Sequence, residues 1–210
     1  VNFLGSAATI DAGNLDITSS GRVTFKAAVN TTSTVTIDSA SIVIDATFNS
    51  GGQISLTSDN SQDINSNLSS AMGVSLLGAG QVELHANINS GGGEDILVEP
   101  SLVLTNDAAL STGAGSGTII LQNTVDGTYH LDLTADLGNV LISQAVGSTN
   151  ALAGLTIQSA ALVEMDDSFT FAHQNAVITA NAIIFSGPVN STEGSTGDLT
   201  IHNTGLLTIA

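Results

Sequence analysis

The chain has 210 residues, 42% of them hydrophobic and only 3% aromatic, and its 19 acidic and 2 basic residues give a formal net charge of −17. This charge excludes nucleic-acid binding through phosphate contacts, because the main attractive term would be reversed, and it repels anionic lipid. Cysteine is absent and no apolar run reaches the roughly 18 to 20 residues of a membrane span, which excludes disulfides, thiolate metal sites and direct membrane insertion.

Short runs of alternating apolar and polar residues set up a repeat, and residues 35–53 show it most clearly. Residues 35–37 and 42–44 place apolar side chains at every second position, and Phe48 precedes an Asn-Ser-Gly-Gly corner. Alternation at period two means that one face of each strand is buried. Three strands this short cannot form a sheet alone, so they must bury their apolar faces against the next unit. Residues 35–53 therefore predict one rung of a solenoid.

The same three-strand unit recurs about every 20 residues along the chain. Its first strand starts at Leu15, Val35, Ile54, Val74, Ile96, Leu131, Leu155, Ala176 and Leu199. The second strand begins inward at Val23, Ile42, Val82, Leu102, Val140, Val163, Ile183 and Leu207. A third apolar position, often followed by Asn and small residues, lies at Val29, Phe48, Leu68, Ile88, Leu110, Val146, Phe169 and Val189.

Two units depart from this pattern, at residues 54–73 and 115–131. In the unit that starts at Ile54, the second strand reads Ser-Gln-Asp-Ile, so only Ile64 is a good inward residue and we expect a loose rung. Between residues 115 and 131 there is an extra strand near Ile119 and no clear second strand. We interpret this segment as a shortened or rearranged rung closed by an Asp126-Gly127 turn, a pair that favours positive φ.

These patterns predict an all-β fold. No window keeps apolar residues at helical spacing, whereas Thr, Val and Ile are frequent and 22 glycines interrupt the chain. We predict a single parallel β-helix (β-solenoid) of roughly nine or ten rungs, a rod about 45 Å long. Residues 1–210 are expected to form one continuous domain, an interior segment of a longer array, because neither end shows the cap that a solenoid needs.

Oxygen-rich corners make calcium the metal that the sequence favours. Glu94 with Asp95 and Asp166 with Asp167 lie at predicted corners and are the calcium candidates. The Gly-Gly-x-Gly-x-Asp nonapeptide of calcium-loaded β-rolls is missing, however, so the pattern names ligands without a complete motif.

Catalysis is not expected from the polar residues. A zinc site needs three or more convergent ligands, but the histidines fall on distant rungs, where we interpret them as solvated outward side chains. The four histidines are His85, His130, His173 and His202. Paired carboxylates within about 10 Å could hydrolyse a polysaccharide, yet the outward neighbours on adjacent rungs are mostly uncharged, so no acidic cleft is predicted.

Outward positions allow two surface interpretations. Four of nine outward second-strand residues are aliphatic, which favours a lateral contact surface, although scattered surface apolar residues need no explanation. These nine are Thr24, Val43, Asp63, Glu83, Val103, Leu141, Glu164, Ile184 and Thr208. The outward first-strand ladder contains Thr36, Ser55, Ser75, Thr156 and Thr200. Regular Thr arrays are typical of ice-binding β-solenoids, but Asp16, Leu97 and Asp132 interrupt this one.

Two stretches carry a family resemblance. Residues 125–160, VDGTYHLDLTADLGNVLISQAVGSTNALAGLTIQSA, and residues 197–210, GDLTIHNTGLLTIA, resemble the β-strand repeats of very large bacterial surface exoproteins, the filamentous-haemagglutinin-like adhesins. At the level of pattern the resemblance covers nearly the whole chain. It implies a right-handed β-helix in a secreted or cell-surface protein used for adhesion, matrix or envelope structure, and it brings no catalytic residues.

The leading hypothesis is therefore a non-enzymatic extracellular structural or adhesin module, a β-solenoid rod or filament on the bacterial cell surface or in its matrix. Its expected partners are other copies, end to end or laterally, and host or cell-surface glycans or proteins. The alternative is a carbohydrate-binding or polysaccharide-cleaving β-helix. A substrate groove of that kind needs aromatic platforms beside acidic pairs, and the chain has no Trp and only Tyr129 as a tyrosine.

Overall fold

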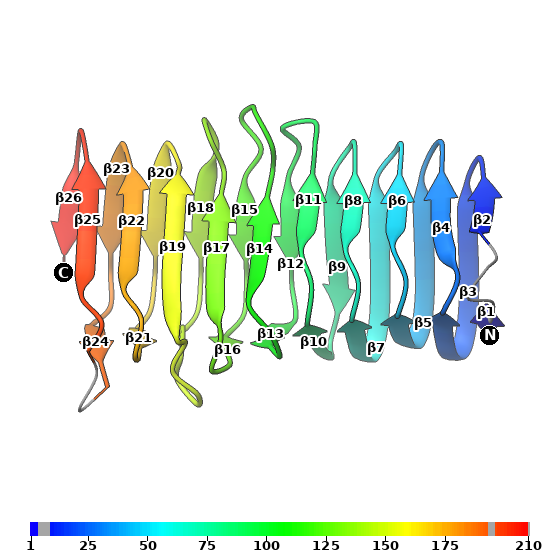
Figure 1. The fold of residues 1–210 in the computed structure, drawn as a ribbon, viewed down its shortest axis with the longest axis horizontal. Helices are drawn as coiled ribbons and strands as arrows, with labels where there is room; N and C mark the ends of the chain where they lie inside the picture. The colour runs from blue at the N-terminus through cyan, green and yellow to red at the C-terminus, as the bar shows by residue number, and fades with distance from the viewer. Residues whose placement is uncertain (4–8, 193–195, 210) are drawn as a thin grey trace.

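The computed structural model describes residues 1–3, 9–192 and 196–209, and every helix or strand element within them is a β-strand. The strands stack in parallel as a solenoid of about ten turns. The chain climbs the strands that face the viewer, crosses the upper edge and descends behind them while it advances from right to left, so the winding is right-handed (Figure 1). The prediction of a right-handed parallel β-helix of nine to ten rungs is confirmed.

The strands that face the viewer in Figure 1 form a ten-stranded sheet, here called the front sheet. Its strands are β2 (Thr9–Ala12), β4 (Ala28–Thr31), β6 (Phe48–Ser50), β8 (Leu68–Ser70), β11 (Ile88–Ser90), β14 (Ala108–Ser111), β17 (His130–Thr134), β19 (Gly154–Ser159), β22 (Ala176–Ala180) and β25 (Leu199–Asn203). They pair with one another in this order along the rod axis. Successive side chains of each strand point alternately outward to solvent and inward to the core.

The back sheet runs behind it along the whole described rod. Its path is β1 (Asn2–Phe3), β3 (Leu15–Phe25), β5 (Val35–Ile44), β7 (Ile54–Ile64), β9 (Val74–Gly78), β12 (Ile96–Val98), β15 (Ile119–Leu121), β18 (Asn139–Ile142), β20 (Leu162–Met165), β23 (Ala182–Phe185) and β26 (Leu207–Ile209). Shorter strands lie along the lower edge of the rod as drawn in Figure 1: β10 (Gln81–Leu84), β13 (Ser101–Leu104), β16 (Val125–Asp126), β21 (Phe169–Phe171) and β24 (Val189–Ser191).

A column of aliphatic side chains fills the interior on each sheet. In the back sheet, Val35 pairs with Ile54, and the same register continues rung by rung to Ile183 and Leu207. The buried residues of the described chain form one contiguous cluster, and Val35 and Ile54 are essentially unexposed within it. Burying each such side chain stabilises the fold by about 1.5–3 kcal/mol relative to leaving it exposed. The predicted stacking of inward Val, Ile and Leu is confirmed.

The sequence-based register is wrong by one face after residue 115. Ile119, interpreted as an extra strand, continues the first-strand column, because it pairs with Ile96 on one side and Val140 on the other. Leu131, expected to start a first strand, instead pairs with Ala108 in the front sheet. The expected second strands from Val140 onward therefore continue the first-strand column of the back sheet. The expected third positions Val146, Phe169 and Val189 lie at the lower edge.

The physical reason for this error is a long turn between β14 and β15. Residues 112–118 contain glycines, and Gly113 and Gly115 adopt φ values of 72° and 149° that other residues rarely take. The lower-edge strand of the same rung shrinks to β16, and Gly127 follows it with φ 126°, as the Asp-Gly pair predicted. All three faces show the same period-two alternation, so periodicity alone cannot identify the face on which a strand lies.

The rung at residues 54–73 was expected to be loose, but it is regularly paired with the rungs on both sides. A buried glutamine takes the inward position that an aliphatic residue occupies on other rungs. Gln62 is 0% exposed, and its Nε2 donates hydrogen bonds to the backbone carbonyls of Leu56 at 3.0 Å and Leu77 at 2.9 Å. The side-chain amide thus bonds to backbone carbonyls of both β7 and β9 inside the rung.

Candidate functional surfaces

The four calcium candidates lie at two different edges of the solenoid. Glu94 and Asp95 occupy the upper turn before β12, and both are exposed. Asp166 and Asp167 follow β20 at the lower edge, three rungs further along the axis, and are also exposed. The structure therefore does not bring the two pairs together. Within the described ranges, no group of three or more His, Asp or Glu residues is placed to hold a metal ion.

Several corner carboxylates instead accept hydrogen bonds from the backbone. Asp95 accepts from the Thr118 N–H on the next rung at 2.7 Å, and Asp167 accepts from the adjacent Ser168 N–H at 2.6 Å. Asp126 accepts from two backbone N–H groups, those of Thr149 and Asn150, at 2.8 and 3.1 Å. These bonds satisfy turn amides that no strand partner reaches. The sequence signal for this role is an Asp beside a turn; at Asp126 it was interpreted as a turn, but at Asp95 and Asp167 it was interpreted as a calcium ligand.

The histidines lie on separate rungs, as expected, but one of them is not solvated. The His130 side chain is only 18% exposed, and its Nε2 lies 2.9 Å from the Thr156 hydroxyl and 3.7 Å from Asp132. It packs over Gly154, where an added Cβ would lie 2.6 Å from the imidazole Nδ1. The expectation of a solvated side chain is therefore wrong for His130. The small neighbour Gly154 is the reason, because it leaves room for the ring against the sheet.

Four outward aliphatic residues form one column on the back sheet, whereas Val103 lies on β13 at the lower edge. Leu97, Ile120 and Leu141 pair on the adjacent strands β12, β15 and β18, and Ile184 follows one rung after Glu164. We call these four aliphatic residues the aliphatic stripe. The pattern of alternation predicts Leu97 and Leu141 in different ladders, because it does not reveal that Ile119 continues the first-strand column.

Uncharged side chains flank the middle of the aliphatic stripe along its two central strands. On the strands of Ile120 and Leu141, the outward positions two residues away hold uncharged side chains, whereas the rungs on either side hold acidic ones. The uncharged flanking residues are Thr118, Gln122, Asn139 and Ser143. On a chain of net charge −17, this is a face where two copies would meet with little repulsion.

Two other surface expectations are wrong. Val43, counted among the outward aliphatic residues, is only 3% exposed, and Arg22 and Asp63 on the flanking strands approach to 3.6 Å across it. The expected Thr ladder does not form either, because Thr36 lies in the back sheet and Thr156 in the front sheet. The hydroxyl array behind the ice-binding interpretation is therefore divided between two faces.

No protein-family model, curated protein or solved structure matches this chain. In the part of the chain that the structure describes, no helix is long and apolar enough to cross a membrane. The features that bear on function are therefore the solenoid's own surfaces and the aliphatic core that supports them.

Proposed function

We propose that the chain is a non-enzymatic structural module, a β-solenoid rod of an extracellular or cell-surface bacterial protein that displays or spaces other regions and associates with further copies. The observation that carries this proposal is the continuous buried core. Both sheets run the length of the described rod, and each interior rung packs between its two neighbours. Such a structure extends in one dimension and resists bending, because each backbone pairs with the turns on either side.

The extracellular location is supported by the resemblance of residues 125–160 to bacterial exoprotein repeats and by composition. A chain without cysteine has no disulfides that would hinder export in an unfolded state. A high net negative charge keeps a rod with long exposed sheets soluble. On intact bacteria that carry the protein, an antibody against the folded rod should label the cell surface, and label that appears only after lysis would contradict this location.

Lateral association is the self-contact that the surface favours. The aliphatic stripe offers a narrow apolar contact on an uncharged part of a flat sheet. A second copy placed back to back would pair the stripe with itself in an isologous contact. Four aliphatic side chains fall short of the roughly 1,200–2,000 Å² that a stable complex buries, so this contact is weak and pairs two rods only at high local concentration.

Small-angle scattering combined with an activity assay tests the structural proposal. The isolated rod should scatter as a thin particle about 45 Å long. It should release no reducing ends from acidic or neutral polysaccharides. A globular scattering profile would contradict the rod, and clear turnover that disappears when a surface carboxylate is replaced would show that the solenoid is an enzyme.

A further inference from the structure

Unequal turns hollow out the upper edge of the rod near its C-terminal rungs. The turns from the front sheet to the back sheet span residues 135–138 after β17 and 204–206 after β25, but only 160–161 after β19 and a single residue, Asn181, after β22. Two short turns between two longer ones leave an open hollow of about 590 Å³. We call it the upper-edge groove. This volume lies within the range of about 300–1,000 Å³ that is typical of small-molecule sites.

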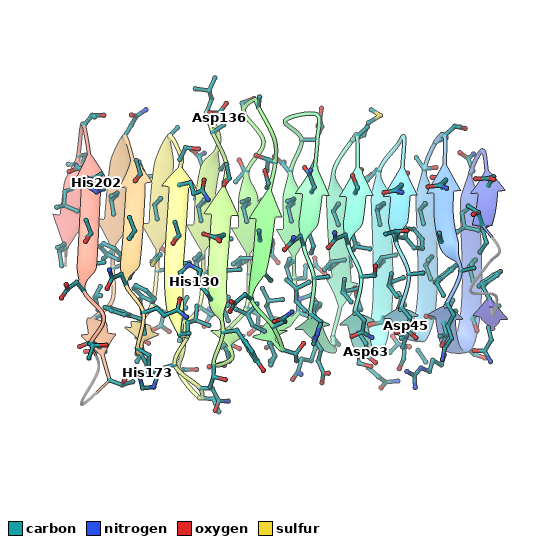
Figure 2. The ribbon with its side chains drawn as sticks, viewed as in Figure 1. Asp45, Asp63, His130, Asp136, His173 and His202 are labelled. Atoms are coloured by element: carbon teal, nitrogen blue, oxygen red, sulfur yellow. The ribbon has the colours of Figure 1, made fainter. Side chains whose placement is uncertain are left out.

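One wall of the groove is held rigidly by the preceding rung. The Gly115 N–H donates to Asp136 Oδ2 at 3.3 Å, and the Leu137 N–H donates to the Gly115 carbonyl at 2.9 Å. Asp136 adopts φ 52°, a left-handed conformation that Asp tolerates better than most residues. Leu137 is 70% exposed at the tip of this wall. Figure 2 shows Asp136 and His202 at the same upper edge, on rungs separated by β19 and β22.

The floor and the far wall combine apolar surface with uncharged polar groups. Ala160 and Ala180 lie under the two short turns, and Ile201 borders them. Thr204 donates its hydroxyl to Asn181 Oδ1 at 3.0 Å, which orients that amide across the groove's far wall. Because the Asn181 oxygen is engaged, its NH₂ group keeps donor capacity for a ligand.

Three further groups in the groove have free hydrogen-bonding capacity. The hydroxyls of Ser159 and Thr179 and the ring of His202 make no hydrogen bond to another described residue. Hydroxyls both donate and accept, and an amide NH₂ donates, so the groove can match vicinal hydroxyl groups, which also donate and accept. The alanine floor suits the apolar C–H face of a sugar ring. Asp136 is the one carboxylate among the described lining residues, and the chain's charge of −17 disfavours an acidic sugar.

We propose that the upper-edge groove binds a neutral saccharide of one or two sugar units. Asn181, Thr179 and Ser159 hydrogen-bond its hydroxyl groups, and the ring lies over Ala160 and Ala180. Without an aromatic side chain to stack on the ring, the dissociation constant is on the order of 1 mM. This binding site goes beyond the structural function and does not depend on it, because it needs only one folded rod.

Titration of the isotope-labelled full chain by ¹H–¹⁵N NMR tests the site. The probes are lactose, cellobiose and N,N′-diacetylchitobiose, added to several times the expected dissociation constant. At least one should cause saturable shifts confined to amides of residues 136–138, 159–161, 179–181 and 201–204. Digalacturonic acid is the acidic comparison and should bind more weakly. Absence of saturable shifts with all three probes, shifts spread over every turn, or equal binding of the acidic sugar would overturn the proposal.

Paired substitutions separate the site from a general effect on the rod. Thr179→Val removes one hydroxyl of the groove, and we expect the saccharide affinity to fall about fivefold to tenfold. Thr36→Val makes the same change on the back sheet, away from the groove, and should leave the affinity unchanged. Equal affinities for the wild type and Thr179→Val would overturn the assignment. If the scattering profile stays that of a rod while no sugar binds, only the binding site is refuted and the structural function is not.

Discussion

At the scale of single residues, the face of the sheet on which a side chain lies decides whether a polar group is tolerated there. Ile44 is fully buried in the interior column, whereas its neighbour Asp45 is exposed and accepts a hydrogen bond from Asn65 at 2.9 Å on the next rung. Figure 2 shows Asp45 near the lower edge, close to Asp63. Adjacent residues at the end of β5 therefore face a dry core and water, and a polar side chain has opposite consequences at them.

Ile44→Asp should abolish folding, because an unpaired carboxylate in the dry interior costs more than the roughly 4 kcal/mol at which single changes become exceptional. Asp45→Asn should change the free energy of unfolding by less than about 0.5 kcal/mol, since an amide oxygen can still accept the Asn65 hydrogen bond. Urea unfolding followed by circular dichroism measures both. Similar effects of the two changes would show that the inward and outward assignment is wrong.

Gln62→Ala should destabilise the rod by about 2–3 kcal/mol, because it leaves a cavity and removes two buried hydrogen bonds to backbone carbonyls. Gln53→Ala is the matched control, since the exposed Gln53 makes only a 3.3 Å contact with Ser75 and should cost little. The comparison uses the same urea titration. Equal stabilities of the two variants would mean that neither the hydrogen bonds nor the buried volume of Gln62 stabilises the rod.

At the scale of elements, the turns decide how closely successive rungs approach. A Cβ added at Gly138, on the upper turn before β18, would collide with the backbone carbonyl of Gly117 on the previous rung. By contrast, a Cβ at Gly21 meets no atom within 4 Å. Glycine is thus required at some turns by the neighbouring backbone and is replaceable at others.

Gly138→Ala should lower the free energy of unfolding by about 1–3 kcal/mol, because the backbones of two rungs must separate to admit the methyl group. Gly21→Ala should be neutral or stabilising by up to about 1 kcal/mol, since it restricts only the unfolded chain. Thermal melts of the two variants beside the wild type measure the difference. A Gly138→Ala variant as stable as Gly21→Ala would contradict the close stacking of the upper turns.

At the scale of the whole molecule, a thin rod carries a large excess of one charge. Only Arg22 and Lys26 are basic, against 19 acidic residues. The Arg22–Asp63 contact is the one pairing of a basic side chain with a carboxylate among the described residues, and the Arg22 side chain is 62% exposed, so it contributes little. Repulsion along the rod therefore opposes both folding and assembly, and salt weakens it.

Raising the ionic strength should raise the melting temperature, because it screens the acidic side chains from one another. Millimolar calcium should raise it too. Magnesium and sodium chloride at the same ionic strength distinguish screening from specific binding, as measured by differential scanning fluorimetry. An additional stabilisation by calcium alone, removed by Asp95→Asn or Asp167→Asn, would establish a specific calcium site. Equal effects of calcium and magnesium would leave screening by divalent ions as the cause.

Lateral association should depend on the aliphatic stripe. Leu141→Glu places a charge at its uncharged centre and should abolish concentration-dependent self-association, because two copies would then bury like charges. Glu164→Gln should strengthen association for the opposite reason. Ser55→Glu, on the same sheet outside the stripe, is the control. Sedimentation velocity measures the three variants, and association that is unaffected by Leu141→Glu would place the contact elsewhere.

The alternation in the sequence determined by itself that this chain is a parallel solenoid with Val, Ile and Leu inside, because a period of two combined with a repeat of about 20 residues permits few other folds. It also identified individual inward residues such as Val35 and Ile54, which the structure confirms. Alternation reports only which side of a strand is buried. It carries no information on which of three similar faces that strand joins.

Only the tertiary structure decided the face of each strand beyond residue 110, because the long turn before β15 and the two-residue strand β16 conceal the strand order in the sequence. The pairing in the structure gathers Leu97, Ile120 and Leu141 into one stripe. Turn lengths, which have no periodic signal, hollow out the upper-edge groove. Each of these features depends on the registry between rungs, and registry is set by turns whose lengths vary independently of the hydrophobic pattern.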